Sequence, residues 1–244
     1  MVRSLWTAAT GMNGQQSNID AISNNLSNVN TTGYKQQRVE FEDLVYQNVK
    51  LAGTPATEDT VTPVGIQQGT GVKIGATQRI MTQGSLQNTG VDTDVAIVGE
   101  GYFRVQKYDG SYAYTRDGSF TVNTEGYLVT KDGDYVLNAT GAMNGDPSRN
   151  NFIQVDPNET VTVNKMGYVI QNDQVVGTLG VVDVDNYDYL EKYGENMYNL
   201  LDGGNRIATD AKVEQGVLET SNVNVVNEMV NMITIQRAYE ANQK

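Results

Sequence analysis

The sequence of 244 residues contains no cysteine and no histidine. The missing thiols exclude disulfides and thiolate metal sites, and the missing imidazoles exclude the commonest general base and metal ligand. Most familiar enzyme sites are therefore excluded, and we expect a protein with no catalytic activity, cofactor or metal site. The lack of cysteine leaves the compartment open, because a protein exported through an oxidising space can dispense with thiols.

Positive charge is also scarce, since 17 Lys and Arg residues stand against 29 Asp and Glu residues, a net charge of -12. This balance opposes binding to phosphate backbones, so we expect no nucleic-acid partner. No stretch of the chain approaches the roughly 20 apolar residues that span a bilayer. The first residues offer Arg3 and a short apolar run, Leu5 to Ala9, which polar residues soon interrupt. We expect neither membrane insertion nor a cleaved signal peptide.

Apolar residues near the N-terminus recur with the spacing of a coiled-coil seam. One row is Leu5, Met12, Ile19 and Leu26, and the row between them is Ala8, Gln15, Ile22 and Val29. The spacing predicts a helix of about 25 residues, on the order of 38 Å long. Ser4 is suited to cap its start, and the run from Asn28 to Gly33 is suited to end it. A helix packed on its own domain is the ordinary interpretation.

The same segment is almost free of charge, which favours a different environment. From Ser4 to Tyr34 the only charged residue is Asp20, whereas eight residues are Asn or Gln. Amide side chains form hydrogen bonds without the cost of burying an ion, so they suit a face pressed against other subunits. Gly11 and Gly14 each destabilise a helix by about 1 kcal/mol relative to Ala. We therefore expect this helix to be disordered in the free monomer and ordered on assembly.

A second amphipathic helix is predicted near the C-terminus, with Asn224 as its cap and Glu228 near the positive end of its dipole. Its apolar arc consists of Val225, Val226, Met229, Val230, Met232 and Ile233. The arc is wider than one partner needs, and Ile235 falls on the far side. An ordinary buried closing helix fits the segment equally well. Because amphipathic segments stand at both ends of a chain whose middle is β-rich, we favour a helix that contacts both the N-terminal helix and neighbouring copies.

The middle of the chain contains short runs rich in β-branched and aromatic residues, which predict strands. The runs span residues 95–98, 102–105, 112–114, 120–122, 127–129, 161–163, 168–170 and 175–184. Turn pairs separate several of them, at Asp109-Gly110, Asp117-Gly118, Glu125-Gly126 and Asp132-Gly133. The pattern predicts antiparallel hairpins in a sandwich or an open barrel.

Residues 45–75 lose helical periodicity and are rich in Thr, Pro, Gly and Gln, which predicts an extended connector lying along a neighbour. The predicted fold class is therefore α+β, with N- and C-terminal helices paired as a coiled coil. We expect a discontinuous helical domain of residues 1–35 with 217–244, a connector at 36–75, and a β-rich outer domain at 76–216.

Motifs that could carry chemistry are weak. Gly69-Thr70-Gly71 with Gly75 lacks the third glycine position and the following helix of a dinucleotide loop. Asp183, Asp185 and Asp188 lack the Gly and Glu that complete a calcium loop. The pairs Asp92 with Asp94 and Asp132 with Asp134 could serve a glycosidase, but acidic turns are the commoner interpretation.

Several ordered motifs resemble the axial proteins of the bacterial flagellum, the family of rod and hook proteins, and within it the proteins of the distal part of the rod. The signature near the N-terminus comprises Asn24, Asn25, Leu26, Asn28, Gly33, Tyr34 and Lys35, and the one near the C-terminus comprises Ser221, Asn222 and Val223. Gln83 to Phe103 and Tyr114 to Phe120 are similar to a block that rod and hook proteins share. The resemblance covers nearly the whole chain.

The resemblance implies a structural subunit that polymerises helically into a rigid tube and transmits torque from motor to hook. Its expected place is the periplasm-spanning rod of the basal body, reached through the flagellar type III export apparatus without a cleaved signal. Expected partners are further copies of the chain, the proximal rod proteins, the hook protein and the surrounding P and L ring proteins. In such proteins the stretch matching Tyr46 to Gly71 is associated with stiffness, and the chain usually continues past the position of Lys244.

The resemblance leads us to expect self-assembly through Leu5, Met12, Ile19, Ile22, Leu26 and Val29 on one helix and Val225, Met229, Met232 and Ile233 on the other. Two alternatives stay open. The chain could be another rod or hook-type protein, although hook proteins carry an additional inserted domain. It could also be a secreted β-rich carbohydrate-active or adhesive domain, which would bind glycans as a monomer and have ordered ends.

Overall fold

The computed structural model describes residues 2–51, 55–57, 60–61, 64–144, 149–157 and 159–243. These residues form two compact units. Unit 1 consists of Met1–Ser27, Gln36–Ile80 and Val223–Lys244, and unit 2 consists of Asn28–Lys35 and Met81–Asn222. The predicted connector thus belongs to the same unit as the two terminal helices, and the short segment after the first helix belongs to the β-rich unit.

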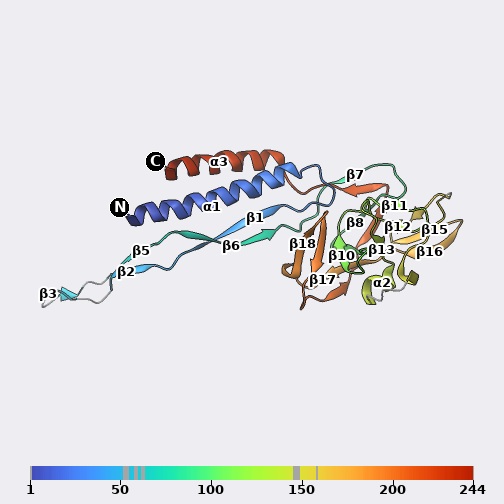
Figure 1. Cartoon of the computed structure of the whole chain (residues 1–244), viewed down its shortest axis with the longest axis horizontal. Helices are drawn as coiled ribbons and strands as arrows, with labels where there is room; N and C mark the ends of the chain where they lie inside the picture. The colour runs from blue at the N-terminus through green and yellow to red at the C-terminus, as the bar shows by residue number, and fades with distance from the viewer. Residues whose placement is uncertain are drawn as a thin grey trace. The chain divides into compact units, whose positions relative to one another are not determined.

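Unit 1 contains both predicted terminal helices, α1 at Val2–Ser27 and α3 at Val225–Gln243, which pack side by side in opposite directions (Figure 1). Gly11 of α1 lies beside Asn242 of α3, and Asn25 lies beside Glu228, as an antiparallel pair requires. The predicted cap of α3 is confirmed, because the Asn224 side chain accepts hydrogen bonds from the amides of Val226 and Asn227. The predicted Ser4 cap is wrong, since α1 already begins at Val2.

A long β-ribbon forms the rest of unit 1. Strand β1 (Gln37–Asp43) pairs antiparallel with β6 (Val72–Arg79), β2 (Gln47–Lys50) with β5 (Ile66–Gln68), and β3 (Pro55–Thr57) with β4 (Thr60–Val61). The segment expected as an extended connector is therefore paired with itself as an antiparallel ribbon. The ribbon packs against α1 at the buried Gly14. A Cβ at this position would lie only 3.0 Å from the Phe41 ring. Gly14 thus allows a close approach of helix and ribbon.

Unit 2 is built on a nine-stranded antiparallel sheet. Its strands run in the order β11 (Thr121–Val122), β12 (Leu128–Val129), β13 (Tyr135–Val136), β9 (Tyr102–Gln106), β10 (Tyr112–Thr115), β19 (Met197–Leu200) and β18 (Leu190–Gly194), and β17 (Val181–Val184) joins β9 to β20 (Arg206–Ala208). Within the described residues the end strands β11 and β18 each pair with one strand only, so this sheet is open.

Smaller elements complete unit 2. A three-stranded sheet contains β14 (Thr162–Val163), β15 (Tyr168–Gln171) and β16 (Gln174–Thr178), while β8 (Val95–Val98) pairs with β21 (Lys212–Gln215) and β7 (Leu86–Asn88) with β22 (Val217–Glu219). The helical elements are α2 (Ala139–Asn144) and short 3-10 turns at Arg149–Asn151 and Tyr187–Tyr189. The predicted strand run 175–184 is divided between β16 and β17, because the chain turns at Gly180.

The core of unit 2 explains why the predicted strands form. Apolar side chains from the strands gather in one cluster around Phe103 and Phe120, whose rings meet edge to face with centroids 5.1 Å apart. A second cluster surrounds Tyr102, Tyr114 and Tyr198. Burial of these large side chains supplies the main stabilisation, at roughly 25 cal/mol for each Å² of apolar surface. Among the described residues, no helix is both long and apolar enough to cross a membrane.

Candidate assembly surfaces and their buried polar supports

The predicted assembly residues of α1 divide between the interior and the surface. Ile22 is buried, and Met12, Ile19 and Leu26 are half-buried, whereas Leu5 is 69% exposed. Trp6, which the sequence analysis did not single out, is 67% exposed beside it. Val29 is half-buried and belongs to unit 2. The first turns of α1 therefore present apolar surface that the described residues leave uncovered.

The predicted residues of α3 divide in the same way. Val225 and Met232 are half-buried, while Met229 and Ile233 are about half exposed, at 49% and 52%. Val226, Met229, Val230 and Ile233 are all exposed and follow one another at helical spacing, and we name them the outer stripe of α3. Ile235, expected on the far side, is half-buried and lines a hollow with Ile22 and Glu228.

The ribbon also exposes apolar side chains. Val45 is 85% exposed, and the others in the described part of the ribbon are Phe41, Tyr46, Val49, Leu51, Val64, Ile66 and Ile74. Among the described residues of unit 1, these side chains stay exposed on the two-stranded ribbon. A surface of this extent marks a contact region in most soluble proteins.

A buried polar cluster joins α1, α3 and the start of β1 within unit 1. The Asn25 amide donates to the Gln37 carbonyl at 2.8 Å and accepts from the Gln37 amide at 2.9 Å, as a strand neighbour would. It also donates to the Glu228 carboxylate at 3.3 Å, which accepts a second bond from Gln36 at 2.7 Å. Asn25 and Glu228 are 1% and 2% exposed. Glu228, expected only near the positive end of the helix dipole, is thus a buried hydrogen-bond acceptor, a role that its local sequence does not indicate.

Unit 2 contains a buried ionic cluster centred on Glu219. Its carboxylate accepts from the Lys35 ammonium at 2.7 Å and from the Gly84 amide at 2.8 Å, and its other oxygen lies 2.9 Å from Nε of Arg116. Lys35 also donates to the Thr82 carbonyl at 2.8 Å. Burial lowers the pKa of the Lys35 ammonium, and the carboxylate of Glu219 opposes that shift. One carboxylate thus neutralises part of the charge of two buried cations.

The cluster connects the two predicted signatures. Gly33 has a positive φ of 67° and donates its amide to the Glu219 carbonyl at 2.8 Å. A Cβ on Gly33 would lie 2.8 Å from the backbone nitrogen of Asp117, so both conformation and space require glycine. Tyr34 is 2% exposed. The segment after α1 is thereby fixed inside unit 2.

The remaining signature residues are less uniform. Asn222 donates to the Thr82 carbonyl at 3.1 Å, Ser221 and Val223 are buried, Asn28 is half-buried and Asn24 is exposed on α1. Ser221 and Asn222 belong to unit 2, whereas Val223 and Asn24 belong to unit 1.

Asp94, considered for a glycosidase pair, and Asp185, considered for a calcium loop, both take part in local hydrogen bonds. Asp94 accepts from the Thr89 hydroxyl at 2.6 Å, and the Asp185 carboxylate accepts from the Asn205 amide at 3.0 Å. Hydrogen bonds from Asn205 lower the pKa of Asp185, whereas burial raises that of Asp134. No cluster of acidic side chains suited to a metal ion occurs in the part of the chain that the structure describes.

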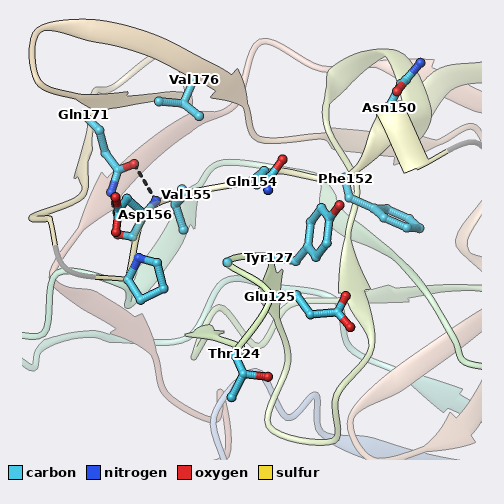
Figure 2. A pocket seen from close by; sticks show the side chains of 12 residues that line it. Thr124, Glu125, Tyr127, Asn150, Phe152, Gln154, Val155, Asp156, Gln171 and Val176 are labelled. Carbon is cyan, nitrogen blue, oxygen red and sulfur yellow. Dashed lines mark hydrogen bonds between the residues drawn. The ribbon is translucent and has the colours of Figure 1, made fainter.

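Figure 2 shows a hollow of unit 2 of about 740 Å³, where aromatic, acidic and amide side chains meet. Tyr127 and Phe152 are edge to face with centroids 6.0 Å apart. The Gln171 amide is engaged with the backbone of Asp156, from which it accepts a hydrogen bond at 2.9 Å. The hollow offers aromatic rings for stacking and amide and carboxylate groups for hydrogen bonds.

Family models match three parts of the chain. The model described as "Flagella basal body rod protein" matches residues 5–35, the "Flagellar hook protein FlgE/F/G D1 domain" matches residues 96–171, and the "Flagellar basal body rod FlgEFG protein C-terminal" matches residues 214–244. The whole chain is similar to the flagellar basal-body rod protein FlgG of Borreliella burgdorferi, at 45% identity over 93% of that relative. The chain belongs to the flagellar basal-body rod protein family.

Other members of this rod protein family agree. The FlgG protein of Bacillus subtilis is 36% identical over the whole chain and 94% of its own length. A Caulobacter vibrioides relative named FlgF is 40% identical over 91% of the chain and 83% of its own length. The predicted resemblance is confirmed. Rod proteins are structural proteins of the basal body and not enzymes, and the secreted carbohydrate-active alternative is not favoured.

Proposed function

We propose that this rod protein is a subunit of the distal rod, where it polymerises helically into a stiff tube that transmits torque from motor to hook. The relatives that support the proposal carry the name FlgG and match the chain from end to end. The single observation that carries it is the outer stripe of α3, an apolar surface that the chain does not cover itself.

Burial of the exposed apolar side chains would provide free energy for assembly. Val226 and Val230 are 69% and 56% exposed, and Met229 and Ile233 about half. Covering them against a neighbouring helix would contribute about 1 kcal/mol for each side chain. The same holds for Leu5 and Trp6 on α1. A monomer leaves this gain unused, whereas a polymer realises it at every subunit.

The pairing of α1 with α3 supports a coiled-coil arrangement within the polymer. Buried or half-buried positions on α3 include Val225, Glu228, Met232, Ile235 and Tyr239, with alternating spacings of three and four, and Ala238 is half-buried beside Tyr239. That alternation is typical of a coiled-coil seam. In the proposal this seam holds the two helices together while the outer stripe of α3 contacts other copies.

The ribbon suits the proposed stiffness. Extended strands paired along their length resist bending, and their exposed apolar side chains from Val45 to Ile66 could lie against a neighbouring copy. An arm wedged between subunits opposes the sliding that bending requires. We propose that the subunit reaches the periplasm through the type III export apparatus without a cleaved signal. There it would contact proximal rod proteins, the hook protein and the P and L ring proteins.

The test compares two charge insertions on α3. Ile233→Asp places a carboxylate in the outer stripe, and Asn227→Asp places one on an exposed polar position of the same helix. We expect the full-length Ile233→Asp variant to unfold at the temperature of the natural protein but to be missing from purified basal bodies. The Asn227→Asp variant should incorporate normally. Normal incorporation of Ile233→Asp would contradict the proposal.

A third variant separates pairing from assembly. Ile22 is 6% exposed inside unit 1, so Ile22→Asp buries a charge among α1, α3 and the ribbon. We expect it to abolish incorporation into basal bodies while the β-rich unit 2 stays folded. Residue-resolved hydrogen exchange on dilute monomer then decides whether the ends order only on assembly. Fast exchange in both helices with protected strands would support that expectation, and protection throughout would contradict it.

A further inference from the structure

The two most buried arginines of unit 2 differ in how their charge is compensated. Arg116 is 4% exposed, and its Nε lies 2.9 Å from the Glu219 carboxylate. Arg104 is 2% exposed, yet within the described residues no carboxylate pairs with it. Its Nε is buried and has no hydrogen-bond acceptor. A buried guanidinium without an anion is costly, so the missing partner calls for an explanation.

Neighbouring groups hold the Arg104 side chain in one position. Its Nη1 donates to the carbonyls of Gly141 at 3.1 Å and Ala142 at 2.8 Å, at the end of α2. The guanidinium carbon lies 3.9 Å from the centre of the Tyr112 ring. Carbonyl dipoles and a ring face attract the cation, but they do not neutralise it. The charge is therefore fixed in place and only partly compensated.

A second cation lines the same hollow. Arg104 and Arg206 of β20 both border a hollow of about 300 Å³, to which Ser111 and Asn199 add polar side chains. Burial lowers the pKa of Arg104, and the nearby charge of Arg206 lowers it further. The two like charges repel each other, and an anion bound between them would relieve that repulsion. Asp202, an exposed residue at the rim, is the acidic group that borders the hollow.

We propose that this hollow is a carboxylate-binding site in which Arg104 and Arg206 together hold the anion. Guanidinium groups bind carboxylates through paired hydrogen bonds, and two of them around one small hollow favour a single carboxylate. A neighbouring copy of this acidic chain or a free small acid could supply it. The proposal rests on unit 2 alone and does not depend on polymerisation.

The test uses acetate as the probe on the full-length monomer. The Nε–H group of Arg104 is followed by nitrogen-edited NMR, with its signal assigned by its loss in Arg104→Lys. We expect a saturable shift with added acetate. Arg206→Gln should weaken the apparent affinity about tenfold, because one of two charge-assisted contacts is lost. Asp202→Asn should tighten it, whereas Lys212→Gln, which removes an exposed cation elsewhere in unit 2, should leave it unchanged.

A second experiment identifies the source of the carboxylate. The same Arg104 signal is recorded by solid-state NMR on assembled rods without acetate. A signal already at the shifted position identifies a neighbouring copy as the donor, and a signal that still moves on adding acetate identifies a free acid. Either result supports the site. No saturable shift in monomer or rods, or equal affinities in Arg206→Gln and Lys212→Gln, would overturn it and leave Arg104 as a cap for the carbonyls of α2.

Discussion

Replacing Glu219 by Gln tests the buried ionic cluster of unit 2 most directly. The change keeps the size of the side chain but removes the negative charge that faces Lys35 and Arg116. The NH₂ group of the new glutamine would also face another hydrogen-bond donor, either Nε of Arg116 or the donating groups of Lys35 and Gly84. Breaking a buried ion pair on one side costs roughly 3–5 kcal/mol. At about 2–4 °C for each kcal/mol in a domain of this size, we expect the melting temperature to fall by roughly 10 °C.

The stability of Glu219→Gln as a function of pH provides a second, independent test of the cluster. Burial holds the pKa of Lys35 below its ordinary value of 10.5, and the carboxylate of Glu219 raises it. Removing Glu219 lowers that pKa further. The unfolded chain then binds more protons than the folded one between the folded pKa and 10.5, so stability rises with pH across that window. The deficit of Glu219→Gln should therefore be largest at neutral pH and shrink as Lys35 loses its proton.

The assay can follow each unit separately. The single tryptophan, Trp6, reports on unit 1, while buried tyrosines such as Tyr198 give unit 2 a near-ultraviolet circular dichroism signal. Glu214→Gln, the same change at an exposed position of β21, is the matched control. Adding Lys35→Met to Glu219→Gln should recover part of the loss, because one uncompensated cation is removed. Indistinguishable melting curves for Glu219→Gln and Glu214→Gln would refute the reasoning.

Three further outcomes follow from the same structure. Asn25→Asp should lower the stability of unit 1 by about 1–3 kcal/mol, because it places a second carboxylate next to that of Glu228 and removes a hydrogen-bond donor. Urea unfolding checks this, with the exposed change Asn13→Asp as the control. Equal unfolding midpoints for the two variants would contradict the prediction. Gly118→Ala should prevent normal folding of unit 2, since its Cβ would lie 1.6 Å from a carbonyl oxygen; native near-ultraviolet dichroism would count against this. Burial raises the pKa of Tyr187 to about 12 from 10.0, so the stability that this tyrosine contributes to the folded state is complete below pH 10 and is lost as the pH rises towards 12. Tyr187→Phe should therefore reduce the fall in melting temperature between pH 10 and pH 12. An unchanged fall would contradict this prediction.

The sequence by itself determined the elements whose signals are local. The seven-residue spacing from Leu5 to Leu26 predicted α1, the cap at Asn224 predicted the start of α3, and runs such as 102–105 predicted strands of unit 2. The motifs around Gly33 and Ser221 carried the family, which the comparisons confirm. Periodicity and capping act within a few residues, so a single sequence displays them.

Only the tertiary structure decided which distant residues meet. Glu219 and Glu228 look like ordinary surface acids in the sequence, yet both are 2% exposed, because Lys35, Arg116, Asn25 and Gln36 arrive from segments far along the chain. The ribbon was missed for the same reason, since its pairing joins β1 to β6 across a long intervening segment of weak strand formers. Burial and pairing depend on where the rest of the chain lies, and no local pattern contains that information.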